Sequence, residues 1–565
     1  MSTKSIQAAF PLSPQQTGML YASLAEREKG LFIEQFTCRI RGNLNVALFR
    51  EAWQKVVDKH EMLRTAFIWK SQKEPIQVVL SRAEIGFQRQ DLRAFTAPER
   101  ALRVEAFLGL DAQQPFNLSR PPLMRIALSQ VEEMEYQFVW TIHHIVVDGW
   151  CRPLVLEEAS KIYAALAAGE SVEIKPSPPY RNYVAWLKKQ DSAAAETFWR
   201  EYLSGFIEPT ALGRPVNEPL SPDRAAGLDF AENRLPEAVV RVFQNHVKKY
   251  GVTLNTVLQG AWALLLSRYS GKNDVVFGTT VSGRPPGLEG VDQMVGLFIN
   301  TLPFRIQILP NSEFFSWLQQ LQQQHAEIRN YEHCSAGQVH GWSGVPLKRP
   351  LYESIIVFQN YPGASSGFGL SDAVEITEIR SVGAKTAYPL TLLAGSPGKN
   401  GIAFRAIYNR ARFANGSVAA LLQHLMALLT SIAASPDSPV SALAEFILDG
   451  EVPIVFAASG PDPQHNEFVA PRNDIEREVA SIWAEVLGVS EVSVTADFLD
   501  LGGHSLAATQ LINALQARLQ VYIPVRTLFE CSTVARLASA VVQQIVANTE
   551  SSSVSEVLNQ IESGN

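Results

Sequence analysis

Cysteine is scarce in this chain of 565 residues, and the cysteines that occur lie far apart. They are Cys38, Cys151, Cys334 and Cys531, and no two of them form a Cys-x-x-Cys pair. A disulfide framework or a structural zinc site needs several cysteines at close, regular spacing. We therefore expect free thiols, and neither a disulfide framework nor a cysteine-based metal site.

The sequence also lacks a basic surplus and a long apolar run. The formal net charge is −7, and no segment gathers the lysines and arginines that a polyphosphate or an anionic membrane would require. No uninterrupted apolar stretch approaches the roughly 20 residues of a membrane span, and residues 1–16 lack the apolar core of a secretory signal. These absences predict a soluble, cytoplasmic protein with no nucleic-acid or membrane partner. We also expect a monomer.

The larger, N-terminal part of the chain mixes helical and strand patterns. The segment 48–67 carries apolar residues at helical spacing, and 255–270 is typical of a mostly buried helix. The segment 274–285 is short, β-branched and ended by Gly-Arg-Pro, as in a strand that runs into a turn. Interleaved helices and strands predict an α/β layered region. The proline-rich stretch 171–180 predicts a boundary between two lobes. The proline-rich stretch 435–472 predicts a linker, part of which packs against another part of the protein.

Amphipathic helices are predicted near the C-terminus. Apolar residues recur at helical spacing in 475–486, 505–520 and 532–547, and the first stretch opens with acidic residues that favour a helix N-terminus. Three helices in so short a span predict a small bundle. The tail 547–565 opens with a serine run and then repeats the helical spacing over 554–561, as either a docking helix or a frayed terminus would.

The stretch QFVWTIHHIVVDGWC, from Gln137 to Cys151, places two histidines and an aspartate in an otherwise apolar segment. Alternation along a strand puts His144 on the face of Trp140 and points His143 the opposite way. Three interpretations fit these residues alone: core histidines with a turn aspartate, a metal site, or a site of acyl transfer. The metal site is the weakest, because adjacent histidines diverge and no nearby glutamate or third histidine completes a ligand set. We predict no metal.

The sequence also lacks a Gly-x-Ser-x-Gly motif, which would supply a serine nucleophile. Acyl transfer at the histidine pair would therefore proceed by direct attack on a bound thioester. A histidine with a pKa near neutrality can take the proton of an attacking amine or hydroxyl, or orient that group by a hydrogen bond.

The segment DFLDLGGHSLAATQL (497–511) places a serine after two glycines at the start of a predicted helix. By itself Ser505 would be an ordinary N-cap residue. The larger pattern, with an acidic residue and phenylalanine before Leu-Gly-Gly-His-Ser-Leu, resembles the peptidyl carrier proteins of nonribosomal peptide synthetases over residues 472–545. The resemblance implies that Ser505 carries 4′-phosphopantetheine, whose phosphodiester would lie at the helix N-terminus. It also implies that four neighbours shape the surface for a phosphopantetheinyl transferase: Asp500, Gly502, Gly503 and His504.

The histidine pair belongs to a longer pattern as well. His-His-x-x-x-Asp-Gly (143–149) resembles the signature of condensation domains, relatives of chloramphenicol acetyltransferase. Further segments in the family's order extend the similarity over about residues 8–440. These segments are PLSPQQTGMLY (11–21), KHEMLRTAF (59–67), YRNYVAW (180–186), VGLFINTLPFR (295–305) and GVPLKRPLYESIIVFQNYP (344–362). One residue departs from the pattern: Asn182 occupies a position where aspartate is usual.

The resemblance implies a role for each residue of the signature. His144 corresponds to the catalytic histidine, and His143 is expected to support its loop. Asp148 corresponds to an aspartate that pairs with an arginine, and we expect Arg64 to be that arginine. Gly149 is expected to let the backbone approach the thioester oxygen closely.

The fold implied is α/β, with two chloramphenicol-acetyltransferase-like lobes that form a V and a small all-α carrier bundle behind them. The expected divisions are 8–175 for the N-terminal lobe, 176–440 for the C-terminal lobe, 441–471 for a linker, 472–546 for the carrier and 547–565 for the tail. A carrier arm would enter from each side, so that the reacting groups meet at His144. Asn300 lies near the expected crossover of the second lobe, and its role stays open.

The implied function is nonribosomal peptide synthesis, in which a carrier-bound aminoacyl amine attacks an upstream carrier-bound acyl or peptidyl thioester. The linker is too short to contain an adenylation domain, so we expect Ser505 to be loaded in trans by a separate adenylation enzyme. The other expected partners are an upstream donor carrier protein, a phosphopantetheinyl transferase, and a downstream synthetase or thioesterase. Two alternatives stay open: ester formation, and an inactive condensation-like platform that recruits partner enzymes to the carrier.

Overall fold

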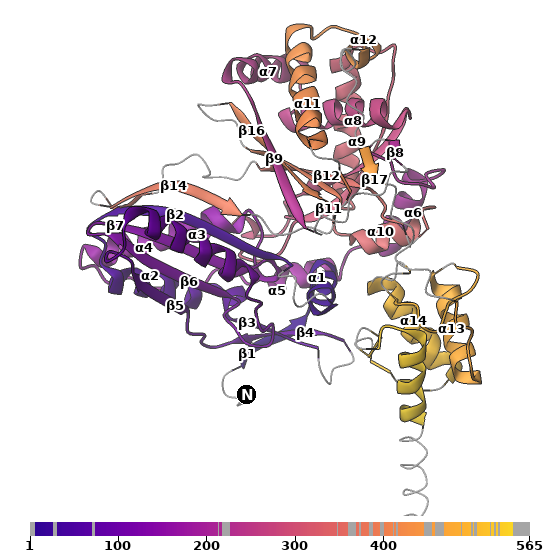
Figure 1. The fold of residues 1–565 in the computed structure, drawn as a ribbon, viewed down its shortest axis with the longest axis horizontal. Coiled ribbons are helices and arrows are strands. Elements are labelled where there is room, and N and C mark those ends of the chain that lie inside the picture. Colours follow the sequence, from indigo (N-terminus) through magenta and orange to yellow (C-terminus); the bar gives the residue numbers. More distant parts are fainter. Residues whose placement is uncertain are drawn as a thin grey trace, which may run out of the picture.

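The computed structural model shows two α/β lobes and a small helical unit (Figure 1). The described residues are 6–25, 31–69, 74–212, 214–216, 227–346, 349–359, 369–371, 374–382, 388–395, 401–410, 412–413, 416–445, 455–457, 468–487, 489–498, 501, 505–519, 521, 523–524, 527–528 and 531–545. The helix predicted at 554–561 lies outside this part of the chain.

The first lobe is built on a six-stranded mixed sheet in the order β13-β14-β2-β7-β6-β5. Its strands are β2 (Ile33–Gly42), β5 (Gly86–Asp91), β6 (Met124–Glu132), β7 (Glu135–His143), β13 (Gly369–Ser371) and β14 (Val374–Val382). Its main helices are α2 (Val46–Lys59), α3 (Ala97–Gln113) and α4 (Cys151–Ala167). Helices α2 and α4 pack on one face, where Trp53 and Trp140 lie in a shared core. Helix α3 covers the other face, where Asp111 accepts hydrogen bonds from Gln35 and Thr141.

A three-stranded sheet in the order β1-β4-β3 completes this lobe. Its elements and the adjoining short helices are β1 (Ile6–Pro11), α1 (Pro14–Ala25), η3 (Glu61–Arg64), β3 (Thr65–Ile68) and β4 (Ile76–Leu80). The helix expected over 48–67 therefore ends early, because α2 stops at Lys59 and the chain turns into β3. Thr65 and Phe67 are fully buried and pair with β4, so tertiary pairing overrides the helical spacing there.

The second lobe has its own six-stranded sheet, in the order β11-β10-β12-β15-β16-β9. Its strands are β9 (Leu228–Leu235), β10 (Asp274–Val281), β11 (Asn300–Gln307), β12 (Ser354–Gln359), β15 (Leu390–Gly395) and β16 (Ile402–Asn409). Its helices are α6 (Ser192–Tyr202), α7 (Glu237–Tyr250), α8 (Leu254–Ser270), η5 (Val291–Gln293), α9 (Phe314–Arg329), α10 (Ala336–Trp342), α11 (Ser417–Ala434) and α12 (Val440–Glu445). The helix predicted at 255–270 and the strand within 274–285 are confirmed as α8 and β10.

Helix α11 is the one helix in the described part of the chain with the length and apolar composition of a membrane span. Its apolar side chains, such as Leu422 and Leu429, lie in the core of the second lobe, and 56% of the helix is buried. A buried core helix accounts for that composition.

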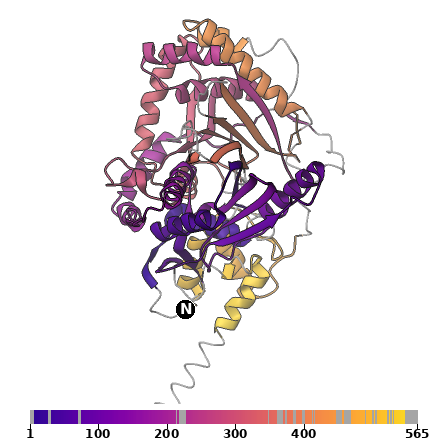
Figure 2. The same ribbon diagram turned by 90° about the vertical axis from the view of Figure 1, so that its left-hand side faces the viewer.

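The two lobes are interlocked, which differs from the expected division at residue 175. Strand β14, which follows β12 of the second lobe in the chain, crosses over and pairs antiparallel with β2 of the first sheet (Figures 1 and 2). Helix α5 (Arg181–Leu187) places Tyr183 in the core of the first lobe, beside Phe298 from the second half of the chain. The lobes therefore share strands and core residues, which a single cut in the sequence cannot describe.

The segment between the second lobe and the helical unit also contacts the second lobe. Strand β17 (Val455–Ala457) pairs in parallel with β8 (Arg214–Val216). The expectation of a linker that partly packs is confirmed for these three residues.

The C-terminal unit is a helical bundle with its own core. It contains α13 (Asp474–Leu487), α14 (Ser505–Leu519) and a third helix over residues 534–545. Trp483 and Phe498 pack edge to face within it. The three predicted helices are confirmed. Helix α14 contacts α10 of the second lobe and α1 of the first, so the bundle lies at the junction of the lobes (Figure 1).

Candidate active site

The histidine pair lies where β7 ends. The strand ends at His143, and His144 begins the short 3₁₀ turn η4 (His144–Val146). The His144 N–H donates to the carbonyl oxygen of Phe32, 2.8 Å away on the segment that leads into β2. The two imidazoles have different partners, as expected, but a turn and not strand alternation separates them. The expected alternation of side chains does not extend to His144, because β7 ends at His143.

The His144 side chain is mostly buried but reachable, with 11% of its surface exposed. Its Nε2 atom lies 3.4 Å from Oε1 of Glu34 on β2, a carboxylate that is 18% exposed. Its Nδ1 atom is buried and has no hydrogen-bond partner among the described residues. The Nε2 edge is therefore the edge at which an incoming group can exchange a proton.

The His143 side chain is held from both ring nitrogens. Nδ1 accepts a hydrogen bond from the Ile145 N–H at 3.1 Å, and Nε2 lies 3.3 Å from Oγ of Ser23. Burial, and secondarily the charge of His144, lowers the pKa of His143 to about 3. Since Nδ1 accepts, the neutral ring carries its proton on Nε2 and donates to Ser23. His143 thus fixes the turn that presents His144, and its protonation state is constant near neutral pH.

The carboxylate of Asp148 is fully buried and joins the start of α4 to the segment that precedes β11. Oδ1 accepts hydrogen bonds from the N–H groups of Trp150 and Cys151, at 3.1 and 3.2 Å, where α4 begins. Oδ2 accepts from the N–H groups of Phe298 and Ile299, at 3.0 and 3.3 Å. Such a buried carboxylate is stable only because donors surround it.

The arginine that pairs with Asp148 is Arg284, and the prediction of Arg64 is wrong. Arg284 Nη2 lies 3.4 Å from Asp148 Oδ1, and both side chains are almost inaccessible to solvent. Arg64 instead donates to the carbonyl oxygens of Val57 and Leu80 and to the side chain of Gln7, so it joins α2 to the small sheet. These contacts engage Nε and Nη1, and among the described residues Arg64 makes no hydrogen bond or ion pair with Asp148.

Arg284 joins the two lobes from the second-lobe side. Its guanidinium donates to the carbonyl oxygens of Val291 and Met294 and lies 4.0 Å from the centre of the Phe298 ring. Nη2 also lies 3.4 Å from Sγ of Cys151, which in turn donates to Asp148. Burial raises the pKa of the Cys151 thiol, so the sulfur keeps its proton and remains a donor.

Two further residues of the sequence prediction lie near this network. Gly149 is buried in the turn between Asp148 and α4. Asn300 begins β11, and its Nδ2 donates to the carbonyl oxygens of Glu332 and Cys334. The contacts of Asn300 hold a loop of the second lobe, and they give it no contact with the histidine pair.

Sequence reasoning missed Phe32, Glu34 and Arg284. Phe32 has a left-handed backbone, with φ of 61°, which no pattern of side chains reveals. Glu34 could have been noticed in the sequence, because this charged residue lies on the same face of the strand as the buried Phe36 and Cys38. Arg284 follows the strand β10 in the Gly-Arg-Pro turn, but its partner is 136 residues away in the chain.

Ser505 is the first residue of α14, as predicted from the Gly-Gly-His-Ser motif. Free N–H groups at the start of a helix favour an anion, and a phosphodiester attached to Ser505 fits that position. Asp500, Gly502, Gly503 and His504 lie outside the described residues.

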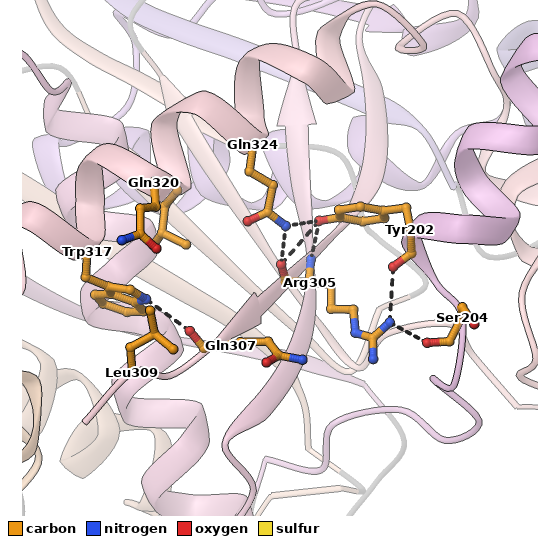
Figure 3. Close-up of a pocket in the computed structure, with 9 residues that line it drawn as sticks. Tyr202, Ser204, Arg305, Gln307, Leu309, Trp317, Gln320 and Gln324 are labelled. Atoms are coloured by element: carbon orange, nitrogen blue, oxygen red, sulfur yellow. Dashed lines mark hydrogen bonds between the residues drawn. The ribbon is translucent and has the colours of Figure 1, made fainter. Parts of the chain in front are cut away.

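A hollow of about 550 Å³ lies in the second lobe beside β11 (Figure 3). The Tyr202 hydroxyl accepts from the Arg305 N–H and donates to its carbonyl oxygen, while Gln324 donates to that same oxygen. The Arg305 guanidinium pairs with Asp274. These contacts satisfy the edge of β11, which blocks further strand pairing, and the hollow is lined mainly by groups already paired with one another.

No group of three or more histidine, cysteine, aspartate or glutamate side chains is arranged to hold a metal ion in the described part of the chain.

The fold is a two-lobed α/β domain with a buried His-His-x-x-x-Asp-Gly turn, followed by a small helical bundle that begins one helix at Ser505. The family profile described as "Condensation domain" matches residues 6–446, and that described as "Phosphopantetheine attachment site" matches residues 477–541. The chain belongs to the condensation-domain family of nonribosomal peptide synthetases. Its carrier domain is of the kind that bears 4′-phosphopantetheine on a serine. Only residues 447–476 separate the two matched regions, which leaves no space for an adenylation domain.

Curated relatives belong to peptide synthetases. The chain is 40% identical over 434 residues to one of the linear gramicidin synthase proteins of Brevibacillus parabrevis, and the match covers 77% of this chain and 6% of that relative. It is 32% identical over 474 residues to surfactin synthase subunit 3 of Bacillus subtilis (strain 168), and here the match covers 82% of this chain and 36% of the relative. The chain thus spans a small part of the length of these relatives.

Solved structures with a similar fold include condensation domains. The condensation domain from Monacolin K polyketide synthase MokA superposes with a TM-score of 0.64 at 19% identity, covering 77% of this chain and 100% of that one. The starter condensation domain of rhizomide synthetase RzmA gives a TM-score of 0.63 at 21% identity, covering 77% and 99%. At these identities the likeness shows the fold alone, which is the predicted two-lobed α/β fold.

Proposed function

We propose that this protein forms an amide between an acyl or peptidyl group delivered by an upstream carrier protein and an amino acid held on its own Ser505. One observation carries the proposal: the His144 side chain is partly exposed, with Nε2 beside the carboxylate of Glu34, while His143 and Asp148 of the same signature are buried and hydrogen-bonded. A preorganised base beside a fused carrier is the arrangement that direct thioester aminolysis requires.

The reaction needs few groups from the protein. The 4′-phosphopantetheine on Ser505 would supply the thiol that holds the acceptor as a thioester. His144 would take a proton from the acceptor amine at Nε2 and return it to the departing donor thiolate. The contacts of His143 and Asp148 keep the turn in place, so that positioning contributes along with proton transfer.

The proposal includes loading in trans. The chain passes from the condensation domain to the carrier without an adenylation domain, so the amino acid on Ser505 would come from a separate adenylation enzyme. An upstream carrier would deliver the donor, a phosphopantetheinyl transferase would modify Ser505, and a downstream synthetase or thioesterase would take the product.

The position of α14 supports this assignment of donor and acceptor. The helix that begins with Ser505 contacts α1, whose Ser23 lies against His143, and α10 of the second lobe. The fused carrier therefore lies next to the elements that hold the active-site turn, as an acceptor carrier should.

The test is condensation by the purified full chain. Ser505 is loaded with an aminoacyl-phosphopantetheine, a donor carrier bearing an acyl thioester is added, and intact mass spectrometry follows acylation of the chain. We expect product with the wild type, at least about 100-fold less with His144→Ala, and no loading with Ser505→Ala. Equal rates for wild type and His144→Ala would favour the inactive platform. Aminoacylation of purified protein by ATP and amino acids alone would refute loading in trans.

A further inference from the structure

We infer that Glu34 is the residue that selects an amine over a hydroxyl as the attacking group. The inference rests on the proposed function and deepens it, because it concerns whether the product is an amide or an ester.

Glu34 shares the reachable edge of His144. Its Oε1 atom lies 3.4 Å from His144 Nε2, and the two side chains are 18% and 11% exposed. A direct charge-assisted hydrogen bond would be shorter, at about 2.7–2.9 Å. The carboxylate therefore lies beside Nε2 without closing it off. A small donor that reaches Nε2 meets Oε1 at the same time.

The start of β2 is fixed against the histidine pair. Ile33 is directly opposite His143 in the β2–β7 ladder, and Glu34 is opposite Ile142. Phe32 adopts the left-handed backbone conformation, with φ of 61°, and its carbonyl oxygen accepts the His144 N–H. A bulky residue in that conformation is strained, and such strain is retained where surrounding contacts require it. These contacts fix the position of Glu34 relative to Nε2.

An amine and a hydroxyl make different demands at this point. When an amine attacks the donor thioester, the C–N bond forms, the nitrogen becomes positively charged and both of its hydrogens are acidic. One proton passes to His144 Nε2, and the other can be held by the Glu34 carboxylate in a charge-assisted hydrogen bond. The C–S bond then breaks, and the departing thiolate takes the proton from His144. The second hydrogen remains on the amide nitrogen.

A hydroxyl has a single proton, which His144 would take. The oxygen would then face the Glu34 carboxylate with lone pairs only, and the two would repel each other. Glu34 therefore stabilises the transition state for amide formation and opposes the transition state for ester formation.

The experiment compares two acceptors on the full chain. Ser505 is loaded with an aminoacyl-phosphopantetheine or with the 2-hydroxyacyl isostere, and the acyl transfer rate from one donor carrier is measured for each by intact mass spectrometry. The variants are Glu34→Gln and Glu34→Asp, with Glu133→Gln as the matched control. Glu133 is an exposed carboxylate in the β6–β7 hairpin of the same sheet, with 83% of its side chain accessible.

We expect Glu34→Gln to lower the amide-to-ester rate ratio by about 10- to 100-fold, the value of one hydrogen bond to a charged group. Glu34→Asp should keep part of the preference, and Glu133→Gln should keep all of it. Equal losses with both acceptors would show that Glu34 only orients His144, and an unchanged ratio would show no role; either overturns the inference. A wild type that favours the hydroxyl also overturns it, whatever the stability of the variants. No transfer to either acceptor by the wild type would instead refute the proposed function.

Discussion

Arg284 of the second lobe lies with its guanidinium 3.4 Å from the carboxylate of Asp148 in the first lobe, and both side chains are buried. Asp148 also accepts N–H groups from Phe298 and Ile299. The aspartate of the His-His-x-x-x-Asp-Gly signature is therefore also a principal contact between the lobes. The geometry of the candidate active site and the joining of the lobes depend on one carboxylate.

Replacing Arg284 with glutamine should destabilise the protein by about 3 kcal/mol or more, because it leaves a buried charge without its cation. Urea denaturation of single and double variants measures the effect. In a double-mutant cycle, the coupling free energy between Asp148→Asn and Arg284→Gln should be at least about 1 kcal/mol. The coupling free energy between Asp148→Asn and Arg64→Gln should be less than about 0.5 kcal/mol. Coupling of Asp148 to Arg64 in place of Arg284 would contradict the assignment.

Replacing His143 with glutamine should slow condensation without changing its dependence on pH. The pKa of His143 is lowered to about 3, so this residue stays neutral between pH 5 and 9 and contributes no titration in that range. The loss of its bond to the Ile145 N–H should displace His144 and reduce kcat by about 10- to 100-fold. A pH–rate profile of each protein provides the check. A midpoint that moves in His143→Gln would mean that His143 itself exchanges a proton.

Replacing Glu332 with glutamine should stabilise the protein above neutral pH. Burial raises the pKa of Glu332 to about 7, and Arg329 offsets only part of this rise. In the unfolded chain the carboxyl titrates near its ordinary value, so stability is fully present below about pH 4.5 and falls as pH rises through about 7.

The gain of Glu332→Gln over the wild type should therefore grow between pH 4.5 and 8 by up to about 3 kcal/mol, from 1.36 kcal/mol per pKa unit. Thermal or urea unfolding at several pH values measures it. Glu327→Gln, at an exposed position on α9, is the control and should show no such growth. A gain that does not change with pH would contradict the buried, protonated carboxyl.

Replacing Gly283 with alanine should cost more than the same change at Gly251. Both glycines have a left-handed backbone, with φ of 62° and 66°, so each substitution costs about 1–2 kcal/mol of backbone strain. A Cβ at Gly251 meets open space, whereas a Cβ at Gly283 would lie 1.8 Å from the carbonyl oxygen of Phe298. Overlap with backbone should add about 1–3 kcal/mol. Comparing the unfolding midpoints of the two variants tests this. Equal losses of stability would show that the backbone around Phe298 moves aside to accommodate the Cβ at little cost.

The sequence predicted the local features of the site better than its long-range contacts. Ser505 at a helix start and a strand leading to His143 both follow from short patterns. The expectation that Asp148 pairs with an arginine came from the resemblance to condensation domains, and Asp148 does pair with one. The identity of that arginine did not follow from the sequence, because Arg64 and Arg284 are equally plausible by charge, and only the assembled fold places one of them within reach.

Two other features lay beyond sequence reasoning for physical reasons. Helical spacing continues past Lys59, yet pairing with β4 draws Thr65 and Phe67 into a strand. Glu34 reaches His144 only through the register of β2 against β7, which depends on both strands at once. Spacing within one segment cannot give a register between two segments.

Strand β14 has a consequence for how the protein is made. The first sheet leaves the outer edge of β2 unpaired until Val374–Val382 have been synthesised, more than 300 residues after β2 itself. An open strand edge is a site for wrong pairing. On the ribosome, the N-terminal lobe is therefore completed only when much of the second lobe has emerged. A chain released before residue 382 would expose the unpaired edge of β2 close to its histidine pair.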